Sequence, residues 1–301
     1  MSVLVYALGG GFGHVVRGAA LAAAFERNGT PASVLVPETH LALATALGAS
    51  GVGVGATRDP VTLRRHLDAA IEQTACTLLV VDSFPAGLLG ELADPPCVAR
   101  RALLLRLHRD ADAPAFLRAA AAYDHVLDLE PHLDWRPPDL DATPFGAVAR
   151  EPSPDALATA DVLLVATDAL LAPLLLRLAR RLARNGRHVQ VAVSGGIGPP
   201  DREPRPALPL TLGRDAPRVV VGAAGYNLVY EACAADTAHL AVPLPRRFDN
   251  QHLRARTLCE IPGSPEALER RVLELLDGAS FRRRDVSVQS HEALALRLAG
   301  A

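Results

Sequence analysis

The sequence contains no lysine, and its only methionine is Met1. Its 31 basic side chains are therefore all arginine, and 33 acidic side chains bring the formal net charge to -2. A protein that binds the phosphate backbone of a nucleic acid usually presents a strongly basic face. The charge balance therefore argues against nucleic acid as a partner.

Cysteine is also scarce, and the four residues include no Cys-x-x-Cys pair. Zinc sites and disulfide frameworks normally show such pairs, so we expect neither, and the reduced thiols of a cytoplasmic protein are the simplest interpretation. The first apolar stretch ends at Gly9 without a preceding basic segment, which argues against a secretion signal. The most apolar segment, 162–176, contains Asp168 and Pro173 and is shorter than the ~20 residues that span a bilayer.

Along the chain, short apolar runs alternate with longer stretches rich in alanine, leucine and arginine. This alternation is typical of βαβ units and predicts an α/β fold with parallel sheets. At 301 residues the chain exceeds the ~100–200 residues of one domain. Prolines cluster at 150–155, where the periodicity stops, as is usual between separately packed cores. We therefore predict one domain over 1–150 and a second over 151–301.

The same periodicity predicts individual elements. Strands are expected at 3–8, 33–36, 52–54, 78–81, 102–107, 125–129, 144–148, 162–166, 189–193, 219–221 and 238–242. Helices are expected at 15–27, where the pattern is clearest, and at 170–184, 226–234, 250–259, 265–276 and 290–298. The segment 194–200, rich in glycine and proline, is expected to be a loop.

Positions 9–14 read Gly-Gly-Gly-Phe-Gly-His and lie between the first expected strand and the first expected helix. Glycine lets the backbone turn tightly, and a helix N-terminus carries a partial positive charge, so this turn is suited to an anionic or polar ligand. Ligands of α/β proteins also bind at the sheet edge where such strands end. The alternative is a tight turn without a ligand.

His14 closes this turn, and an ordinary histidine titrates close enough to neutrality to accept a proton from a hydroxyl nucleophile. A histidine that only caps or packs in the first helical turn is an equally weighted alternative. A nicotinamide-binding turn would have a third glycine at position 14, but His14 occupies that position. It would also have an acid about 20 residues further on, where Glu38 stands. A nicotinamide-dependent enzyme therefore stays open as an alternative that rests on the other glycines and Glu38.

Asp82 follows the strand expected at 78–81 and precedes a turn that contains Gly87. Such strands end at the ligand-binding edge of the sheet, so Asp82 is placed to orient or deprotonate a substrate hydroxyl. An aspartate after a strand is also a common helix N-cap, and we favour that interpretation, with a short helix over 86–92.

Positions 221–232 combine a strand end, a turn of small residues and a helix, which again makes a pocket for an anion. Glu231 lies about a turn and a half inside this helix, where it can face the pocket and bind a diol. Further along, Asp249, Asn250 and Gln251 open another helix. Helix capping by Asp249 or Asn250 is the alternative role there.

Together these stretches resemble the GT-B glycosyltransferases of family 28 type, which include the bacterial transferase that adds N-acetylglucosamine to the lipid-linked peptidoglycan precursor. The resemblance covers the whole chain in architecture and three or four patches in motif. It implies two Rossmann-like domains facing across a cleft, with an acceptor-side domain over 1–150 and a nucleotide-sugar-binding domain over 151–301. The turn that ends at His14 is similar to the family's acceptor-side loop, which here comprises Gly10, Gly11 and Gly13.

The resemblance also implies roles for residues of the second domain. Glu231 would hold the ribose hydroxyls of the nucleotide sugar, and Asp249 and Gln251 would contact its sugar. The other implied donor-binding residues are Ser194, Gly195, Gly222, Gly225, Tyr226 and Asn227.

One segment departs from the family pattern. The family usually has a glycine-rich turn after the first strand of its second domain, whereas positions 166–169 read Ala-Thr-Asp-Ala. Asp168 would place a carboxylate where a diphosphate needs N–H donors, and the repulsion would weaken the binding of a UDP-sugar. Backbone amides of 194–198 would have to supply the missing donors.

The expected activity is transfer of a sugar from a nucleotide sugar, preferably a UDP-sugar, to an acceptor hydroxyl, with inversion and without a metal or other cofactor. His14, or in second place Asp82, would deprotonate the acceptor, which is expected to be a small molecule or lipid-linked. A lipid-linked acceptor would bring peripheral membrane contact. The alternative is a non-catalytic GT-B protein that binds nucleotide sugars or serves as a partner subunit. A nucleotide-sugar epimerase is disfavoured because the second domain offers few acids and histidines.

Overall fold

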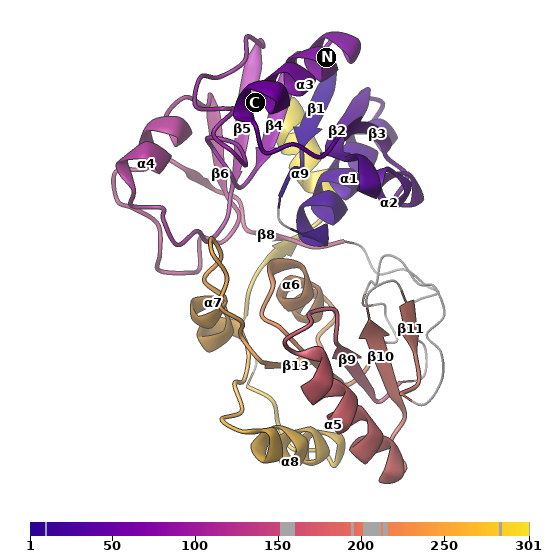
Figure 1. Ribbon diagram of the computed structural model, residues 1–301. Helices are drawn as coiled ribbons and strands as arrows, with labels where there is room; N and C mark the ends of the chain where they lie inside the picture. The colour runs from indigo at the N-terminus through magenta and orange to yellow at the C-terminus, as the bar shows by residue number, and fades with distance from the viewer. Residues whose placement is uncertain are drawn as a thin grey trace. The chain divides into compact units, whose positions relative to one another are not determined.

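The computed structural model (Figure 1) describes residues 1–9, 11–150, 160–193, 196–200, 212, 216–282 and 285–300. The chain divides into two compact units, Met1–Val148 with Gln289–Ala301, and Ala149–Val288. From the sequence we placed all of 151–301 in the second domain. The structure instead returns the chain to the first unit at Gln289, because the last helix packs against the first one.

The first unit is built on a parallel sheet in the order β3-β2-β1-β4-β5-β6-β7. The chain order reverses between β1 and β4, so the carboxyl ends of these two strands lie side by side, at the edge where α/β proteins bind ligands. The predicted α/β class with parallel sheets is confirmed. The strands are β1 (Val3–Tyr6), β2 (Ala32–Pro37), β3 (Ser50–Val54), β4 (Leu78–Asp82), β5 (Arg100–Leu105), β6 (His125–Asp128) and β7 (Thr143–Pro144).

Helices lie between and beside these strands. They are α1 (Phe12–Arg27), the short 3-10 helix η1 (Glu38–His40), α2 (Leu41–Ala46), α3 (Pro60–Gln73), α4 (Pro114–Ala120) and, from the chain's C-terminal end, α9 (His291–Ala299). No helix forms over 86–92, where the sequence analysis expected one. The strand expected over 144–148 is divided, because β7 ends at Pro144 and β8 (Ala147–Val148) pairs instead with β14 (Val288–Gln289).

Helix α1 comes unusually close to the sheet at Gly18. A Cβ atom on this residue would lie 2.4 Å from the Cβ of Ala7 and 3.1 Å from Cγ2 of Val34. In a dinucleotide-binding turn the third glycine gives this close packing, but His14 occupies that position here. Gly18, one helical turn further on, provides the close approach instead.

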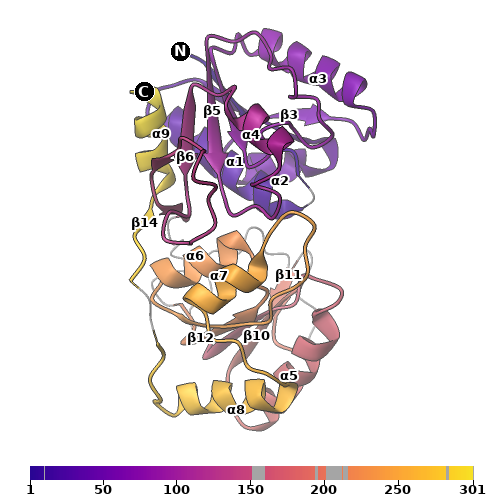
Figure 2. The same cartoon turned by 90° about the vertical axis from the view of Figure 1, so that its left-hand side faces the viewer.

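The C-terminal helix α9 completes the first unit, and it lies beside α1 (Figure 2). An ion pair between Arg27 and Glu292 connects the two helices. His291 at the start of α9 lines a small cavity together with Arg17 and Asp82. Residues near the two ends of the chain thus surround one buried position.

The second unit contains a sheet in the order β11-β10-β9-β12-β13, parallel except for β11, which is antiparallel to β10. The sequence analysis expected a loop over 194–200, and the structure corrects this by placing Gly196–Gly198 in the edge strand β11. The elements are β9 (Val162–Val165), α5 (Ala172–Arg184), β10 (Val189–Val193), β11, β12 (Val219–Gly222), α6 (Tyr226–Ala234), β13 (Ala238–Ala241), α7 (Gln251–Leu258) and α8 (Pro265–Leu276).

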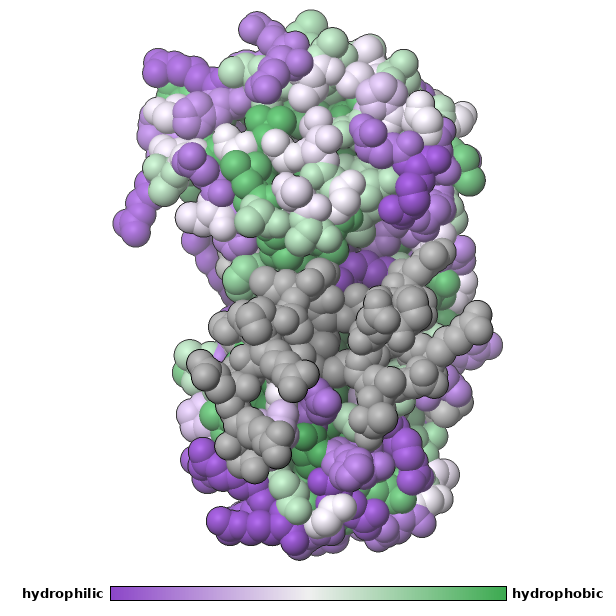
Figure 3. All heavy atoms as spheres, turned by 90° about the vertical axis from the view of Figure 1, so that its right-hand side faces the viewer, coloured by the Kyte–Doolittle hydropathy of each residue, from purple (hydrophilic) through white to green (hydrophobic). Residues whose placement is uncertain are grey.

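The surface mixes polar and apolar side chains. On the face shown in Figure 3, hydrophilic side chains gather over the lower end of the second unit, with apolar ones scattered among them. Large apolar side chains that are exposed, such as Phe12, Leu170 and Leu296, belong to different segments. Within the described ranges, no helix combines the length and the apolar character needed to cross a membrane.

The close packing at Gly18 is testable. We expect Gly18→Ala to lower the free energy of unfolding by about 1–3 kcal/mol, because the added methyl group overlaps Ala7 and pushes α1 off the sheet. Gly55→Ala is the control: its Cβ would meet only Oε2 of Glu38, at 4.0 Å. It should change the stability by less than about 0.5 kcal/mol. Urea unfolding measures both variants, and equal effects would contradict the close approach.

Candidate functional site

The two bases considered from the sequence, His14 and Asp82, form one pair. Nδ1 of His14 lies 2.7 Å from Oδ2 of Asp82. His14 is in the first turn of α1, which follows β1, and Asp82 is the last residue of β4. Because β1 and β4 are neighbours, the fold brings these side chains to the same point of the sheet edge. The expectation that Asp82 caps a helix is wrong, since its carboxylate binds side chains instead.

Two arginines that the sequence analysis did not identify hold the same carboxylate. Nη2 of Arg17 lies 2.7 Å from Oδ2 of Asp82, and Nε of Arg106 lies 3.3 Å from Oδ1. Ser83 adds a hydrogen bond, because its hydroxyl donates to Oδ1 at 3.0 Å and accepts one from Nε of Arg106 at 2.6 Å. Ser83 has a φ of 77°, a strained left-handed conformation that places its hydroxyl in this position.

These contacts fix the protonation states of the pair. Burial opposes the ionisation of Asp82, but Arg17 and Arg106 outweigh it and hold the pKa of the carboxyl well below its usual range. Burial lowers the pKa of His14, Asp82 opposes this effect, and the two arginines add to it. His14 is therefore neutral at neutral pH, with its proton on Nδ1 facing the Asp82 anion. The lone pair on Nε2 is left to accept a proton.

Gly9 makes room for this imidazole. A Cβ atom on Gly9 would lie 2.2 Å from Cδ2 of His14 and 2.7 Å from Nε2. The ring also stacks on Phe84, with ring centroids 5.1 Å apart and an interplanar angle of 28°. Because Gly9 has no side chain, it leaves space for the imidazole of His14, in addition to any role of the turn in binding an anion.

The other residues of the predicted acceptor-side loop have simpler surroundings. Gly11 is the N-cap of α1, which has no side-chain cap, and a Cβ there would meet no atom within 4 Å. Gly13 lies in the first turn of α1. Gly10 lies outside the described residues.

In the second unit, the predicted donor motif has the expected backbone form. Gly222 ends β12, Gly225 is the N-cap of α6 without a side-chain cap, and Tyr226 and Asn227 begin the helix. A helix start of this kind directs backbone N–H groups and a partial positive charge toward the sheet edge. Ser194 and Gly195, the other predicted donor residues, lie outside the described residues.

Glu231, the predicted ribose ligand, is paired with an arginine that the sequence analysis missed. Nε and Nη2 of Arg150 lie 2.9 and 2.8 Å from Oε1 of Glu231. Both side chains are nine-tenths buried or more. Burial raises the pKa of Glu231, and Arg150 opposes that rise. Oε1 is thus occupied by a guanidinium, so a diol at this site would have to share the carboxylate with Arg150 or displace it.

The segment at the start of α7 is held by Arg254, whose side chain is fully buried. Its guanidinium lies 2.9 Å from Oδ1 of Asp249 and donates a hydrogen bond of 3.0 Å to the carbonyl of Ala224. Arg254 therefore ties Asp249 to the turn before α6. Gln251 is also buried, and its side-chain oxygen accepts a hydrogen bond from the amide of Leu244.

The capping alternative is confirmed for Asn250, whose side chain accepts a hydrogen bond from the amide of Leu253 at 3.2 Å. Asp249 does not cap the helix; it is paired with Arg254. The contact of Gln251 with Leu244 orders the loop between β13 and α7, so its predicted contact with a donor sugar would come in addition to a structural role.

Asp168 follows β9, as expected, but its carboxylate is paired. Oδ1 accepts a hydrogen bond of 2.8 Å from the amide of Leu170, and Oδ2 binds the guanidinium of Arg246. Burial opposes ionisation, but the amide and the guanidinium prevail and lower the pKa of this carboxyl. The predicted repulsion of a diphosphate is therefore offset by a neighbouring cation.

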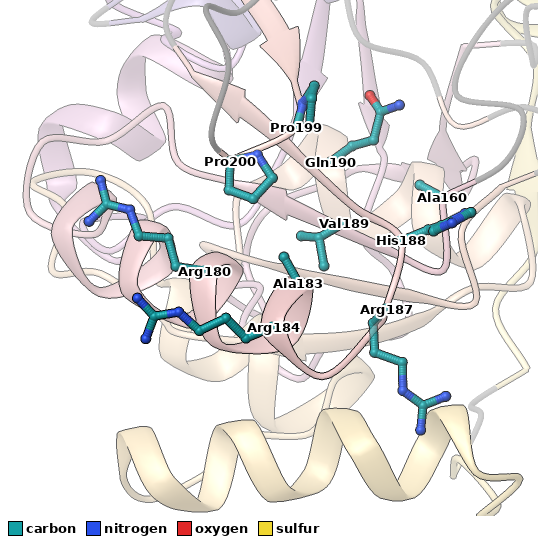
Figure 4. A pocket seen from close by; sticks show the side chains of 10 residues that line it. All are labelled: Ala160, Arg180, Ala183, Arg184, Arg187, His188, Val189, Gln190, Pro199 and Pro200. Atoms are coloured by element: carbon teal, nitrogen blue, oxygen red, sulfur yellow. The ribbon is translucent and has the colours of Figure 1, made fainter.

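A pocket of about 640 Å³ lies at the amino ends of β9 and β10, away from all these residues (Figure 4). In the figure Arg180 and Arg184 extend outward from α5. The guanidinium of Arg187 lies 2.6 Å from the carboxylate of Asp277. No group of three or more histidines, cysteines, aspartates or glutamates in the described part of the chain is placed to hold a metal ion. The candidate residues of each unit lie instead toward the carboxyl edge of that unit's own sheet.

Comparison with known proteins gives structural matches. No protein-family model matches the sequence, and no curated protein matches it. The spinosyn rhamnosyltransferase SpnG, solved with thymidine diphosphate, has a TM-score of 0.60 and 16% identity, covering 100% of this chain and 95% of its own. The spinosyn forosaminyltransferase SpnP has a TM-score of 0.65 and 17% identity, covering 99% and 93%. SsfS6, a glycosyltransferase of Streptomyces sp. SF2575, has a TM-score of 0.63 and 15% identity, covering 100% of both chains.

The chain has the GT-B fold. In GT-B terms, the described sheets are those of its two Rossmann-like domains, and the predicted fold class is confirmed. Structural similarity at such low sequence identity shows the fold alone, so the assignment to family 28 stays a prediction.

The charges around His14 predict the direction in which its pKa shifts when one of them is removed. We expect Arg106→Gln to raise the pKa of His14, because a nearby cation is removed, and Asp82→Asn to lower it, because the anion is removed. A base that works in its neutral form loses activity as pH falls through its pKa, so Arg106→Gln should shift that loss to higher pH. NMR titration of the imidazole measures the pKa directly.

Arg58→Gln is the control for this titration. It changes the net charge by the same amount as Arg106→Gln, and Arg58 is exposed in the loop between β3 and α3. It should leave the pKa of His14 unchanged. Shifts of the same sign in Arg106→Gln and Asp82→Asn would show that the arrangement around His14 is wrong.

Proposed function

We propose that the protein is a glycosyltransferase that moves a sugar from a nucleotide sugar to an acceptor hydroxyl. The observation that carries the proposal is the buried His14–Asp82 pair at the carboxyl edge of a GT-B domain. A neutral imidazole oriented by an anion is suited to remove a proton from a hydroxyl group. Further support comes from the similar structures, which are glycosyltransferases.

In the proposed reaction, the acceptor hydroxyl attacks the anomeric carbon of the donor sugar on the face opposite the diphosphate. The new bond joins the acceptor oxygen to this carbon, while the bond from the carbon to the phosphate oxygen breaks. The hydroxyl proton passes to Nε2 of His14, and Asp82 stabilises the resulting imidazolium. The nucleoside diphosphate leaves with the electron pair, so a single displacement inverts the configuration. The proposed reaction needs no metal ion.

The donor is proposed to bind in the second unit, with its diphosphate at the start of α6, where the uncapped helix favours an anion. Ser194 and Gly195 are retained as proposed donor-binding residues. The sequence favoured a UDP-sugar, but SpnG and SsfS6 were solved with thymidine diphosphate, so dTDP-sugars stand beside it as proposed donors.

A small-molecule acceptor is proposed for the first unit. SpnG was also solved with spinosyn aglycone, which supports an acceptor of this size. A lipid-linked acceptor, with peripheral membrane contact, is the alternative. Stimulation of the reaction by lipid vesicles that carry the acceptor would distinguish the two.

A non-catalytic GT-B protein that binds nucleotide sugars is the second candidate. It is favoured by the Arg150–Glu231 pair, because the proposed ribose ligand already has a cationic partner. Such a protein would bind a donor without ever releasing the nucleoside diphosphate, with or without an acceptor.

The release of nucleoside diphosphate from UDP- and dTDP-sugars, with a panel of hydroxylated acceptors, tests the proposed function. We expect His14→Ala to reduce the turnover by about 10²–10⁴-fold, because the general base is lost, while donor affinity is kept. EDTA should leave the rate unchanged. The configuration of the product's anomeric centre, determined by NMR, should be inverted.

His66→Ala is the matched control, because His66 is an exposed histidine on α3, and it should retain full turnover. Donor binding without release under any condition would favour the non-catalytic candidate. Full turnover by His14→Ala would rule out the proposed base.

A further inference from the structure

An ion pair bridges two loops at the carboxyl edge of the second sheet. Arg246 follows β13 and Asp168 follows β9, and Nη2 of Arg246 binds Oδ2 of Asp168. In the sheet, β12 lies between β9 and β13 and pairs with both. The pair therefore joins the loops that follow the strands on either side of β12, and β12 itself ends at the turn into α6.

Two features that attract anions thus lie at the carboxyl edge of the same sheet. The start of α6 has no side-chain cap, and the turn 223–225 consists of small residues that let a ligand approach the backbone. Arg246 contributes a full positive charge, and its side chain is 43% exposed, so a ligand can reach it. Asp168 provides the counter-charge to Arg246 in this ion pair.

We propose that Arg246 binds the diphosphate of the donor and that Asp168 holds the guanidinium in place until the donor replaces it. The inference rests on the proposed function, because it assigns the charged ligand of the same donor site. A guanidinium binds carboxylate and phosphate oxygens with similar paired hydrogen bonds, so one anion can take the place of the other. In this arrangement Asp168 competes with the diphosphate for Arg246 and does not simply repel it.

The plain alternative is an ion pair that only ties two loops together, and such partly exposed pairs contribute little to stability. The two interpretations predict different signs. If the pair only orders the loops, loss of either partner should weaken nucleotide binding or leave it unchanged. If Asp168 competes with the diphosphate, its removal should strengthen binding while removal of Arg246 weakens it.

Calorimetric titration of the full chain with UDP and with dTDP tests the proposal. We expect Arg246→Gln to raise the dissociation constant roughly tenfold or more, because a charge-assisted contact with phosphate is lost. We expect Asp168→Asn to lower it roughly two- to fivefold, because the competing anion is removed. The titrations are performed at constant ionic strength.

Arg247→Gln is the matched control, since Arg247 is the adjacent exposed arginine and its guanidinium stacks on the ring of Phe248. It should change the dissociation constant less than about twofold, although it removes the same charge. Uridine and thymidine, which lack phosphate, should bind the Arg246→Gln variant as they bind the unmodified protein. Thermal unfolding of each variant verifies that it is folded.

Each outcome has a separate meaning. If the unmodified protein binds neither diphosphate, both the proposed function and this inference fail. If it binds one of them but Asp168→Asn weakens binding, or Arg246→Gln behaves like Arg247→Gln, the inference is overturned and the proposed function stands.

Discussion

The Asp82 carboxylate is the group on which the site of the first unit depends. It is almost completely buried and receives contacts from His14, Arg17, Arg106 and Ser83. A buried carboxylate is costly without partners, and these contacts offset that cost while fixing its charge. The carboxylate in turn sets the tautomer of His14. The strand order of the sheet makes the arrangement possible, because β1, β4 and β5 are consecutive neighbours whose ends deliver these groups.

In the second unit, arginines likewise pair with carboxylates. Arg150 pairs with Glu231, Arg254 with Asp249, and Arg246 with Asp168. Only the last of these guanidinium groups is substantially exposed, whereas that of Arg254 is fully buried and links the start of α7 to the turn before α6. The buried pairs fix the loops, and the exposed one is the pair that we propose exchanges its partner.

Local pattern predicted the α/β class, most strands and helices, and His14 and Asp82 as candidates, because these depend on periodicity and on residues at strand ends. It did not predict contacts that depend on strand order. Arg106 reaches Asp82 only because β5 lies beside β4, and Arg150 reaches Glu231 from a position 81 residues earlier. Arg17 could have been found, since it lies three residues after His14 and therefore on the same helical face. The unit to which α9 belongs also depends on long-range packing.

We propose that phosphates bind at the second unit, whereas the glycine turn of the first unit positions a base. Hydrogen exchange of the full chain, with and without saturating UDP or dTDP, tests this most directly. We expect slower exchange at 223–231 and 168–171 in the second unit. Protection confined to the turn at 9–14 would contradict it, and would instead favour a first unit that binds dinucleotides through its glycines.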